Sequence, residues 1–290
     1  MIFLEREDGY IILDSLRVAQ HIPRDKGGEI LKFYKGQELY FKDCSESLAI
    51  SQLFCTYVLR ALEIPTVSLD MARYQSYKGI VSTSYNPHHL KEFSLKNILD
   101  KYFLEVVLKR KHKSYIQKSY DLYNLEDIYQ ALCYFFRNDL NNEAIVSSLM
   151  QDIVKLFFCQ FLLGDYDMHY RNLIILKDSS FRLAPFFDFD GSFCLDLNST
   201  RYVVALENYG HDSRKRRKPI EVLEESIPKY YELFKELFVL IPTKTEVLND
   251  IEKSLGKKLH PNTIRHICYD EYIAQIDNML KMYEKRFLKK

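Results

Sequence analysis

The sequence predicts an α+β fold of two lobes: a small β-rich lobe with one helix, then a larger and mainly α-helical lobe. Three observations carry this prediction. Short apolar segments separated by glycine-containing turns fill the first third, apolar residues at helical spacing dominate the remainder, and a β-hairpin is expected over 173–183. With 290 residues, 47% of them hydrophobic, the chain can bury a sizeable core in one large or two small domains.

The first lobe is expected to comprise residues 1–88. Its strand-like segments are bounded by turn residues such as Gly27-Gly28 and Lys35-Gly36-Gln37, and they lie at 10–13, 30–34, 38–42, 67–71 and 79–81. Residues 47–62 have apolar side chains at helical rather than alternating spacing, and Pro65 follows just beyond their end. One helix is therefore expected to pack on an antiparallel sheet.

The second lobe is expected to comprise residues 89–290, after a hinge at Asn86-Pro87-His88-His89. Its clearest helix, 144–163, is apolar on nearly every side, which is typical of a central buried helix. Further amphipathic helices are expected at 221–240, 246–255 and 270–287, where a scaffolding role is the usual one.

The polar motif that follows the central helix carries the functional prediction. Gly-Asp-Tyr-Asp-Met-His-Tyr-Arg-Asn spans 164–172, and Ala-Pro-Phe-Phe-Asp-Phe-Asp follows the hairpin at 184–190. Phosphoryl transfer requires a group that accepts the proton of the attacking hydroxyl, and oxygen ligands that hold Mg²⁺ over the ATP phosphates. We assign the first role to Asp167 and the second to Asn172 and Asp188, with Asp190 as a further metal contact.

Each of these residues also has a structural interpretation. Asp165 and Asp167 follow a helix and are suited to a turn, although the joint motif is far rarer than a single turn residue. His169 belongs to the same catalytic loop, where we expect it to support the loop by packing and hydrogen bonding. Asp188 lies between phenylalanines, where a carboxylate is costly unless it is paired or binds a cation.

Binding of ATP between the lobes also needs a lysine on a strand of the small lobe. Lys42 is suited to hold the α- and β-phosphates because a helix follows directly, and Lys32 on the preceding strand is the competing choice. Gly27 and Gly28 lie upstream between two expected strands, where backbone N–H groups can approach phosphate, but an ordinary turn explains them equally well. The order of elements and motifs is that of a protein-kinase-like fold.

Composition limits the partners and the compartment. The formal net charge is +1, so no global field favours nucleic acid or an anionic membrane, and we expect no DNA binding by this chain itself. Six scattered cysteines lack metal-type spacing, so neither disulfides nor zinc are expected. The N-terminus lacks signal-peptide features, and no apolar run is expected to be of membrane-spanning length. We therefore expect a cytoplasmic protein, with secretion as an effector left open.

The motifs at 163–172 and 184–188, together with Glu-Leu-Tyr-Phe-Lys at 38–42 before the 51–64 helix, resemble those of the HipA-like serine/threonine kinases, in particular short members of the HipT and CtkA type. The resemblance spans roughly residues 38–194. It implies that Asp167 is the catalytic base, that Asn172 and Asp188 are metal ligands, and that Lys42 contacts ATP. It also implies a protein substrate, for which some members use an aminoacyl-tRNA synthetase, and a possible antitoxin partner.

Two departures from the family pattern bear on this assignment. The helix after the lysine strand usually offers a Glu to the lysine, but the matching residue here is Gln52, with Glu46 as a substitute. The family often autophosphorylates a serine in its phosphate loop, whereas the segment 24–29 contains no hydroxyl. That switch is therefore absent or relocated.

Two other functions remain open. Phosphoinositide-type lipid kinases also use Asp-x-His-x-x-Asn followed by a metal motif, and Asp-Phe-Asp-Gly at 188–191 comes close to theirs. A pseudokinase that serves as a binding module is the non-catalytic alternative, motivated by Gln52 and the short phosphate loop. The basic run 214–218 is interpreted as a solvated loop or as a surface that recognises an acidic protein, a phosphosite or tRNA.

Overall fold

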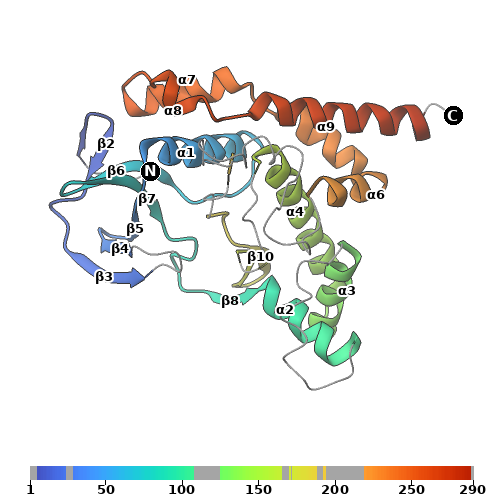
Figure 1. Ribbon diagram of the computed structural model, residues 1–290. Coiled ribbons are helices and arrows are strands. Elements are labelled where there is room, and N and C mark those ends of the chain that lie inside the picture. The colour runs from blue at the N-terminus through green and yellow to red at the C-terminus, as the bar shows by residue number, and fades with distance from the viewer. Residues whose placement is uncertain are drawn as a thin grey trace.

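The computed structural model describes residues 5–23, 29–107, 125–164, 170, 172–187, 192–193 and 219–288. The strands of the first third of the chain gather at one end of the molecule, most helices of residues 95–240 lie at the other, and the C-terminal helices extend along both, as Figure 1 shows. This arrangement is the two-lobed α+β fold that the sequence predicts. The expected boundary between residues 88 and 89 stays a prediction.

The first lobe is built on a seven-stranded sheet. Its strands are β1 (Arg6–Glu7), β2 (Tyr10–Ile12), β3 (Val18–Pro23), β4 (Glu29–Tyr34), β5 (Glu38–Asp43), β6 (Leu69–Tyr74) and β7 (Tyr77–Thr83). They lie in the order β1-β2-β6-β7-β5-β4-β3, and only the β2–β6 pair is parallel. All five expected strands are present. The sequence pattern missed β1 and the edge strand β3, whose largely exposed side chains produce no apolar alternation.

The two faces of this sheet have different environments. Phe33, Leu39 and Phe41 belong to a small buried cluster on one face. The other face carries the intervening residues of β5, and α1 (Glu46–Ala61) packs against β6 and β7. Ser45 caps this helix by accepting a hydrogen bond from the Leu48 N–H at 3.3 Å. The expected helix at 47–62 is confirmed.

The second lobe begins with β8 (Lys91–Ser94), α2 (Leu95–Tyr102) and the π-helical turn η1 (Phe103–Val107). It continues with α3 (Leu125–Phe135), the long helix α4 (Asn142–Leu162), and the hairpin of β9 (Ile174–Lys177) and β10 (Phe181–Leu183). The expected hairpin and central helix are both confirmed. Strand β8 was not predicted from the sequence. It pairs antiparallel with β9, and the hairpin thereby becomes part of a three-stranded sheet.

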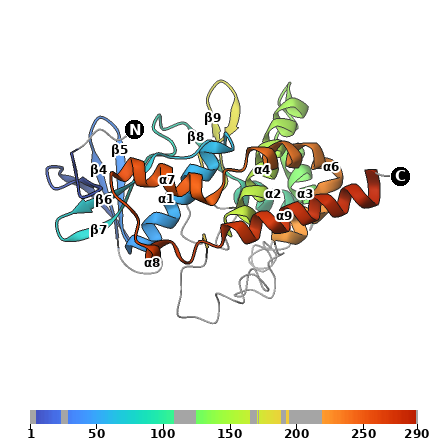
Figure 2. The same cartoon turned by 90° about the horizontal axis from the view of Figure 1, so that it is seen from above.

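The C-terminal helices are α6 (Pro219–Leu240), α7 (Lys244–Leu255), α8 (Pro261–Ile264) and α9 (Tyr269–Tyr283), followed by the π-helical turn η4 (Glu284–Leu288). Helix α6 is kinked at Tyr230, two residues after Pro228, whose ring prevents regular helical hydrogen bonding. Figure 2 shows α7 and α8 beside α1, and α9 extending toward α4 and α6. The C-terminal helices therefore contact both lobes.

Helix α4 corrects one expectation. Within the described part of the chain it is the single helix long and apolar enough to cross a membrane by length and composition, so the expectation that no apolar run reaches that length was wrong. However, 67% of its most apolar window is buried inside the protein. A core helix passes the same test, and burial against α3, α6 and α9 accounts for its apolar surface.

Candidate active site between the lobes

Lys42 lies on the sheet face that packs against α1. It is directly opposite Ile30 of β4 on one side and Ile80 of β7 on the other. Because directly paired residues share a face, these three side chains lie together, while Leu39 and Phe41 project to the other side. Lys42 is half-buried, and Ile80 belongs to the same core as the buried residues of α1.

Lys32, the competing lysine, has a partner of its own. Its ammonium lies 2.5 Å from a Glu38 carboxylate oxygen, and the other oxygen accepts a hydrogen bond from the Tyr40 hydroxyl at 2.7 Å. The bond to Glu38 raises the pKa of Lys32, and the same bond lowers the pKa of Glu38. Lys32 therefore stays charged but is engaged within its own pair of strands.

Helix α1 presents the two candidates for pairing with the lysine in different settings. Gln52 is 2% exposed, in the second turn of the helix. Glu46 is at the first position of α1, and its carboxylate lies 2.9 Å from the ammonium of Lys257. The structure thus gives Glu46 a partner from the C-terminal region, whereas Gln52 is buried within the core side of this helix, as are Ser51 and Thr56.

Asn172 lies at the base of the hairpin, two residues before β9, and is half-buried. The first N–H groups of α2 hold this segment: Leu95 donates to the Leu173 carbonyl at 2.8 Å, and Lys96 donates to the Tyr170 carbonyl at 3.1 Å. The Ala184 N–H donates to the Ile174 carbonyl at 2.8 Å. Asn172 therefore lies at the end of the hairpin from which 184–187 leaves.

The segment that leaves the hairpin joins the first lobe. Phe186 forms a parallel bridge with Thr66, in the connection between α1 and β6. Its N–H donates to the Pro65 carbonyl at 2.8 Å, and its carbonyl accepts from the Val67 N–H and the Thr66 hydroxyl, both at 3.0 Å. The residue two positions before Asp188 is therefore fixed to the small lobe.

Tyr85, the residue before the expected hinge, contacts the same segment. The Tyr85 and Phe187 rings are stacked, with centroids 4.5 Å apart and planes at 17°. Burial, followed by the charge of Glu92 and a hydrogen bond to it, raises the pKa of Tyr85 to about 12, so its hydroxyl stays protonated. The charge of Tyr40, a residue of β5, makes a smaller contribution to this shift. We call Lys42, Tyr85, Asn172 and Phe187 the interlobe region.

The described flanks of the two candidate loops also touch. The Phe193 N–H donates to the carbonyls of Leu163 at 3.3 Å and Gly164 at 3.2 Å. Leu163 and Gly164 precede the first loop, and Phe193 follows the second. The Phe193 ring also packs edge-to-face on Phe54 of α1, with centroids 5.6 Å apart.

Six of the predicted site residues lie outside the described residues: Gly27, Gly28, Asp167, His169, Asp188 and Asp190. The basic run 214–218 lies outside them too. Lys42, Gln52 and Asn172 are described. Lys42 lies on the sheet face that packs against α1. Among the residues that are described, no group of three or more His, Cys, Asp or Glu is placed to hold a metal ion. Two of the expected carboxylate ligands, Asp188 and Asp190, are outside that set.

The sequence did not point to the Tyr85–Phe187 stack or to the Phe186 bridge. Both join residues about a hundred positions apart, so no local periodicity reports them. The only available signal was the aromatic pair preceding Asp188, which we interpreted as the apolar setting of a metal ligand.

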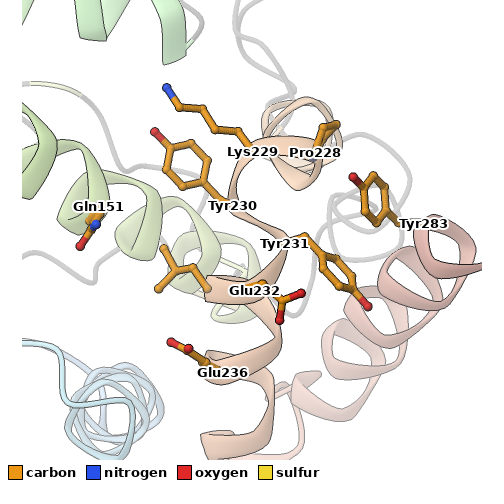
Figure 3. Close-up of a pocket in the computed structure, with 9 residues that line it drawn as sticks. Gln151, Pro228, Lys229, Tyr230, Tyr231, Glu232, Glu236 and Tyr283 are labelled. Carbon is orange, nitrogen blue, oxygen red and sulfur yellow. The ribbon is translucent and has the colours of Figure 1, made fainter. Parts of the chain in front are cut away.

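Two hollows lined by described residues lie in the second lobe. One, of about 550 Å³, is at the kink of α6 and is lined by residues that include Gln151, Tyr230, Tyr231 and Glu236 (Figure 3). A second, of about 430 Å³, adjoins it and shares Gln151, Lys229 and Tyr230. Neither contains any residue of the predicted site. We use the name α6 hollow for the first.

Comparisons with known proteins place the fold. No family model and no curated protein matches the sequence. The structure is similar to the crystal structure of the proinflammatory kinase CtkA of Helicobacter pylori, with a TM-score of 0.66 over 96% of this chain and 99% of that chain, at 12% sequence identity. A Shewanella oneidensis MR-1 toxin–antitoxin complex of HipA, HipB and operator DNA matches with a TM-score of 0.42 over 94% of this chain and 64% of that chain, at 12% identity. The second score carries no argument. The first shows that the chain has the two-lobed fold of CtkA.

Proposed function

We propose that this chain, which has the fold of the kinase CtkA, is an ATP- and Mg²⁺-dependent serine/threonine protein kinase of the HipA-like type. The observation that carries the proposal is the arrangement of the hairpin. It holds Asn172 at the end from which the chain runs to Asp188, and Phe186 and Phe187 connect that chain to the first lobe and the hinge. Such an arrangement supports a nucleotide site between the lobes.

In the proposed reaction, the hydroxyl oxygen of a serine or threonine forms a bond to the γ-phosphorus of ATP. The bond between that phosphorus and the β,γ-bridging oxygen breaks, ADP leaves, and the hydroxyl proton passes to Asp167. Lys42 binds the α- and β-phosphates, with Gly27 and Gly28 on the phosphate loop. His169 supports the loop that carries Asp167, and Gln52 occupies the place of the usual glutamate.

The described residues fit this use of nucleotide and metal. Mg²⁺ prefers oxygen ligands, and Asn172 brings a carboxamide oxygen to a half-buried position at the end of the hairpin. Asn172, Asp188 and Asp190 would hold the ion, which neutralises charge that develops on the phosphates. Lys42 is half-buried, which strengthens its attraction for phosphate relative to a fully solvated ammonium.

The biological setting is proposed from the sequence resemblance. We propose a cytoplasmic toxin or effector that phosphorylates a protein, with an aminoacyl-tRNA synthetase as one candidate substrate. A toxin of this kind is expected to be silenced by an antitoxin partner. These proposals are independent of the phosphate chemistry, because a kinase with a different protein substrate uses the same site residues.

One observation favours a second candidate, a pseudokinase that binds nucleotide or protein without turnover. The described part of α1 offers a buried, uncharged Gln52 where an active kinase usually has a charged partner for its lysine. The three carboxylates at 167, 188 and 190 favour the enzyme, because carboxylates kept near ATP phosphates repel them unless a metal is bound.

The proposed function is tested by transfer of labelled γ-phosphate from Mg-ATP, with the purified protein alone and in a cytosolic lysate. Asp167→Ala is the matched control. Labelled protein bands that are missing with the control variant support a protein kinase and identify its target. Labelled lipid in place of protein would support the lipid-kinase alternative, and nucleotide binding without transfer would support the pseudokinase.

A further inference from the structure

The C-terminal helices hold α1 from the side opposite the sheet. Helices α7 and α8 pack against α1, while α9 packs against α4 and α6. Figures 1 and 2 both show this series of helices running from α1 to the helical lobe. One continuous part of the chain, 244–283, thus contacts the helix of the first lobe and the helix that leads into the candidate catalytic loop.

Polar contacts fix α1 to this segment at two points. The Ser51 hydroxyl lies 2.5 Å from Nε2 of His266, and both residues are fully buried. Burial, with a smaller effect of Lys244, lowers the pKa of His266 to about 4, so the ring is neutral at neutral pH. At the start of α1, Lys257 pairs with Glu46 and lies over the ring of Tyr10, 4.7 Å from its centroid.

Two tyrosines of α9 carry the contact to the candidate site. The Tyr269 ring packs edge-to-face on Phe54 of α1, with centroids 5.0 Å apart, and Phe54 packs in turn on Phe193. Tyr272 packs edge-to-face on Phe161 at 5.6 Å. These rings form a buried layer that joins α1, the end of α4, α9 and Phe193.

Tyr272 is also fitted closely to Gly164, the last described residue before the loop that carries Asp167. Gly164 has φ +54°, a left-handed conformation that favours glycine. A Cβ atom at this position would lie only 2.7 Å from the Tyr272 hydroxyl oxygen. The backbone thus passes directly over the tyrosine, and the ring limits how far Gly164 can move toward α9.

We propose that α9 is a positioning element of the candidate active site, with Tyr272 as the positioning residue. Tyr272 holds Gly164, and Tyr269 holds α1 through Phe54. The position of Gly164 relative to α1 is thereby fixed. This inference rests on the proposed function, since it concerns the orientation of Asp167. It assigns a catalytic consequence to a C-terminal region that the sequence motifs do not cover.

A positioning role differs from ordinary core packing in its kinetic effect. Displacement of a catalytic group by about 1 Å can lower turnover on the order of 100-fold. Loss of packing alone lowers stability but leaves the turnover of folded molecules unchanged. ATP binding depends on Lys42 and on the hairpin, so KM for ATP is expected to change little when Tyr272 is replaced.

The test compares Tyr272→Leu with Tyr231→Leu. Tyr231 of α6 is also buried, but it packs on Tyr283, eleven residues further along α9. At roughly 1.5 Å of rise per residue, that contact is about 16 Å from Tyr272. Tyr272→Phe, which retains the ring, is the conservative variant. Each protein is assayed for kcat, KM for ATP and melting temperature, well below its melting transition.

We expect Tyr272→Leu to lower kcat roughly 10- to 100-fold with KM for ATP nearly constant. The Tyr272→Phe variant should retain most of the wild-type kcat. The Tyr231→Leu variant should have a lower melting temperature but the wild-type kcat. Equal kcat per folded molecule in the two Leu variants would overturn the proposal.

A structural measurement separates failure of this inference from failure of the proposed function. If the wild-type protein transfers no phosphate, amide hydrogen exchange of the peptide 161–173 still tests the contact. Exchange there should increase in Tyr272→Leu and stay at the wild-type level in Tyr231→Leu. Unchanged exchange in both variants would refute the positioning role whether or not the protein is a kinase.

Discussion

The interlobe region and the α6 hollow differ in what they bring together. The hollow has a measurable volume but is lined by tyrosines, glutamates and a lysine from helices of the second lobe, with none of the sequence motifs. The interlobe region comprises a lysine on the sheet, the polar end of the β9–β10 hairpin, and Tyr85 stacked on Phe187. The comparison shows that residue type and strand topology select the interlobe region as the candidate site, whereas the lining of the α6 hollow includes none of the motif residues.

Replacement of Lys42 should have the largest effect on this comparison. Lys42→Met removes the cation that we propose binds the α- and β-phosphates, and phosphate transfer is expected to fall roughly 100- to 1,000-fold, as for other preorganised electrostatic groups. Lys32→Met is the matched control because Lys32 is paired with Glu38. The assay is labelled γ-phosphate transfer at saturating Mg-ATP. Equal losses in the two variants would show that strand position does not select the lysine.

Asn172 comes next. Asn172→Ala removes one of the proposed oxygen ligands, so the Mg²⁺ concentration that gives half-maximal transfer should rise by roughly tenfold. Asn142, which lines the second hollow, provides the matched control Asn142→Ala. A titration of activity with Mg²⁺ measures the difference. An unchanged Mg²⁺ requirement in Asn172→Ala would remove this residue from the metal site.

The hinge stack should have a smaller effect. Tyr85→Ala loses the ring that packs on Phe187, and unfolding free energy is expected to fall by about 0.5 to 1.5 kcal/mol beyond the loss of buried area. Tyr85→Phe keeps the stack but loses the hydrogen bond to Glu92. Urea denaturation of both variants separates the two contributions. If Tyr85→Phe is as destabilised as Tyr85→Ala, the stack contributes nothing measurable.

Changes in the α6 hollow should have the smallest effect on phosphate transfer. Glu236→Gln removes a charge that lines the hollow and leaves the interlobe region untouched. We expect kcat and KM for ATP to remain within about twofold of wild type. Gln151, which lines the hollow, is in the middle of α4, whereas the proposed catalytic loop follows the C-terminal end of that helix. A tenfold fall in kcat or a tenfold rise in KM for ATP would show that the hollow takes part in the reaction, and would contradict the comparison.

Local sequence pattern predicts the parts of the fold that local energetics determine. The apolar surface of α4 marks a core helix, and the alternation in β5 puts Phe41 in a core and Lys42 on the opposite face. The hairpin and its polar ends were predictable for the same reason. Candidate site residues can therefore be selected from the sequence alone, and their chemical roles stay predictions.

The remaining features depend on contacts between distant residues. β8 is a strand because it pairs with β9, although Lys-Glu-Phe-Ser has no marked strand pattern. The bridge of Phe186 to Thr66 and the packing of Tyr272 against Gly164 likewise join segments far apart in the chain. Such contacts are determined by tertiary packing, so they decide how a site is held but leave no periodic signal in the sequence.

The central claim is most directly tested by finding where nucleotide binds. Amide hydrogen exchange with and without Mg²⁺ and a non-hydrolysable ATP analogue measures this for every peptide at once. The account predicts protection in 38–43, in the hinge 84–92 and in 170–187, and unchanged exchange in 142–151 and 228–236. Protection confined to the last two segments would place the nucleotide in the α6 hollow and contradict the account.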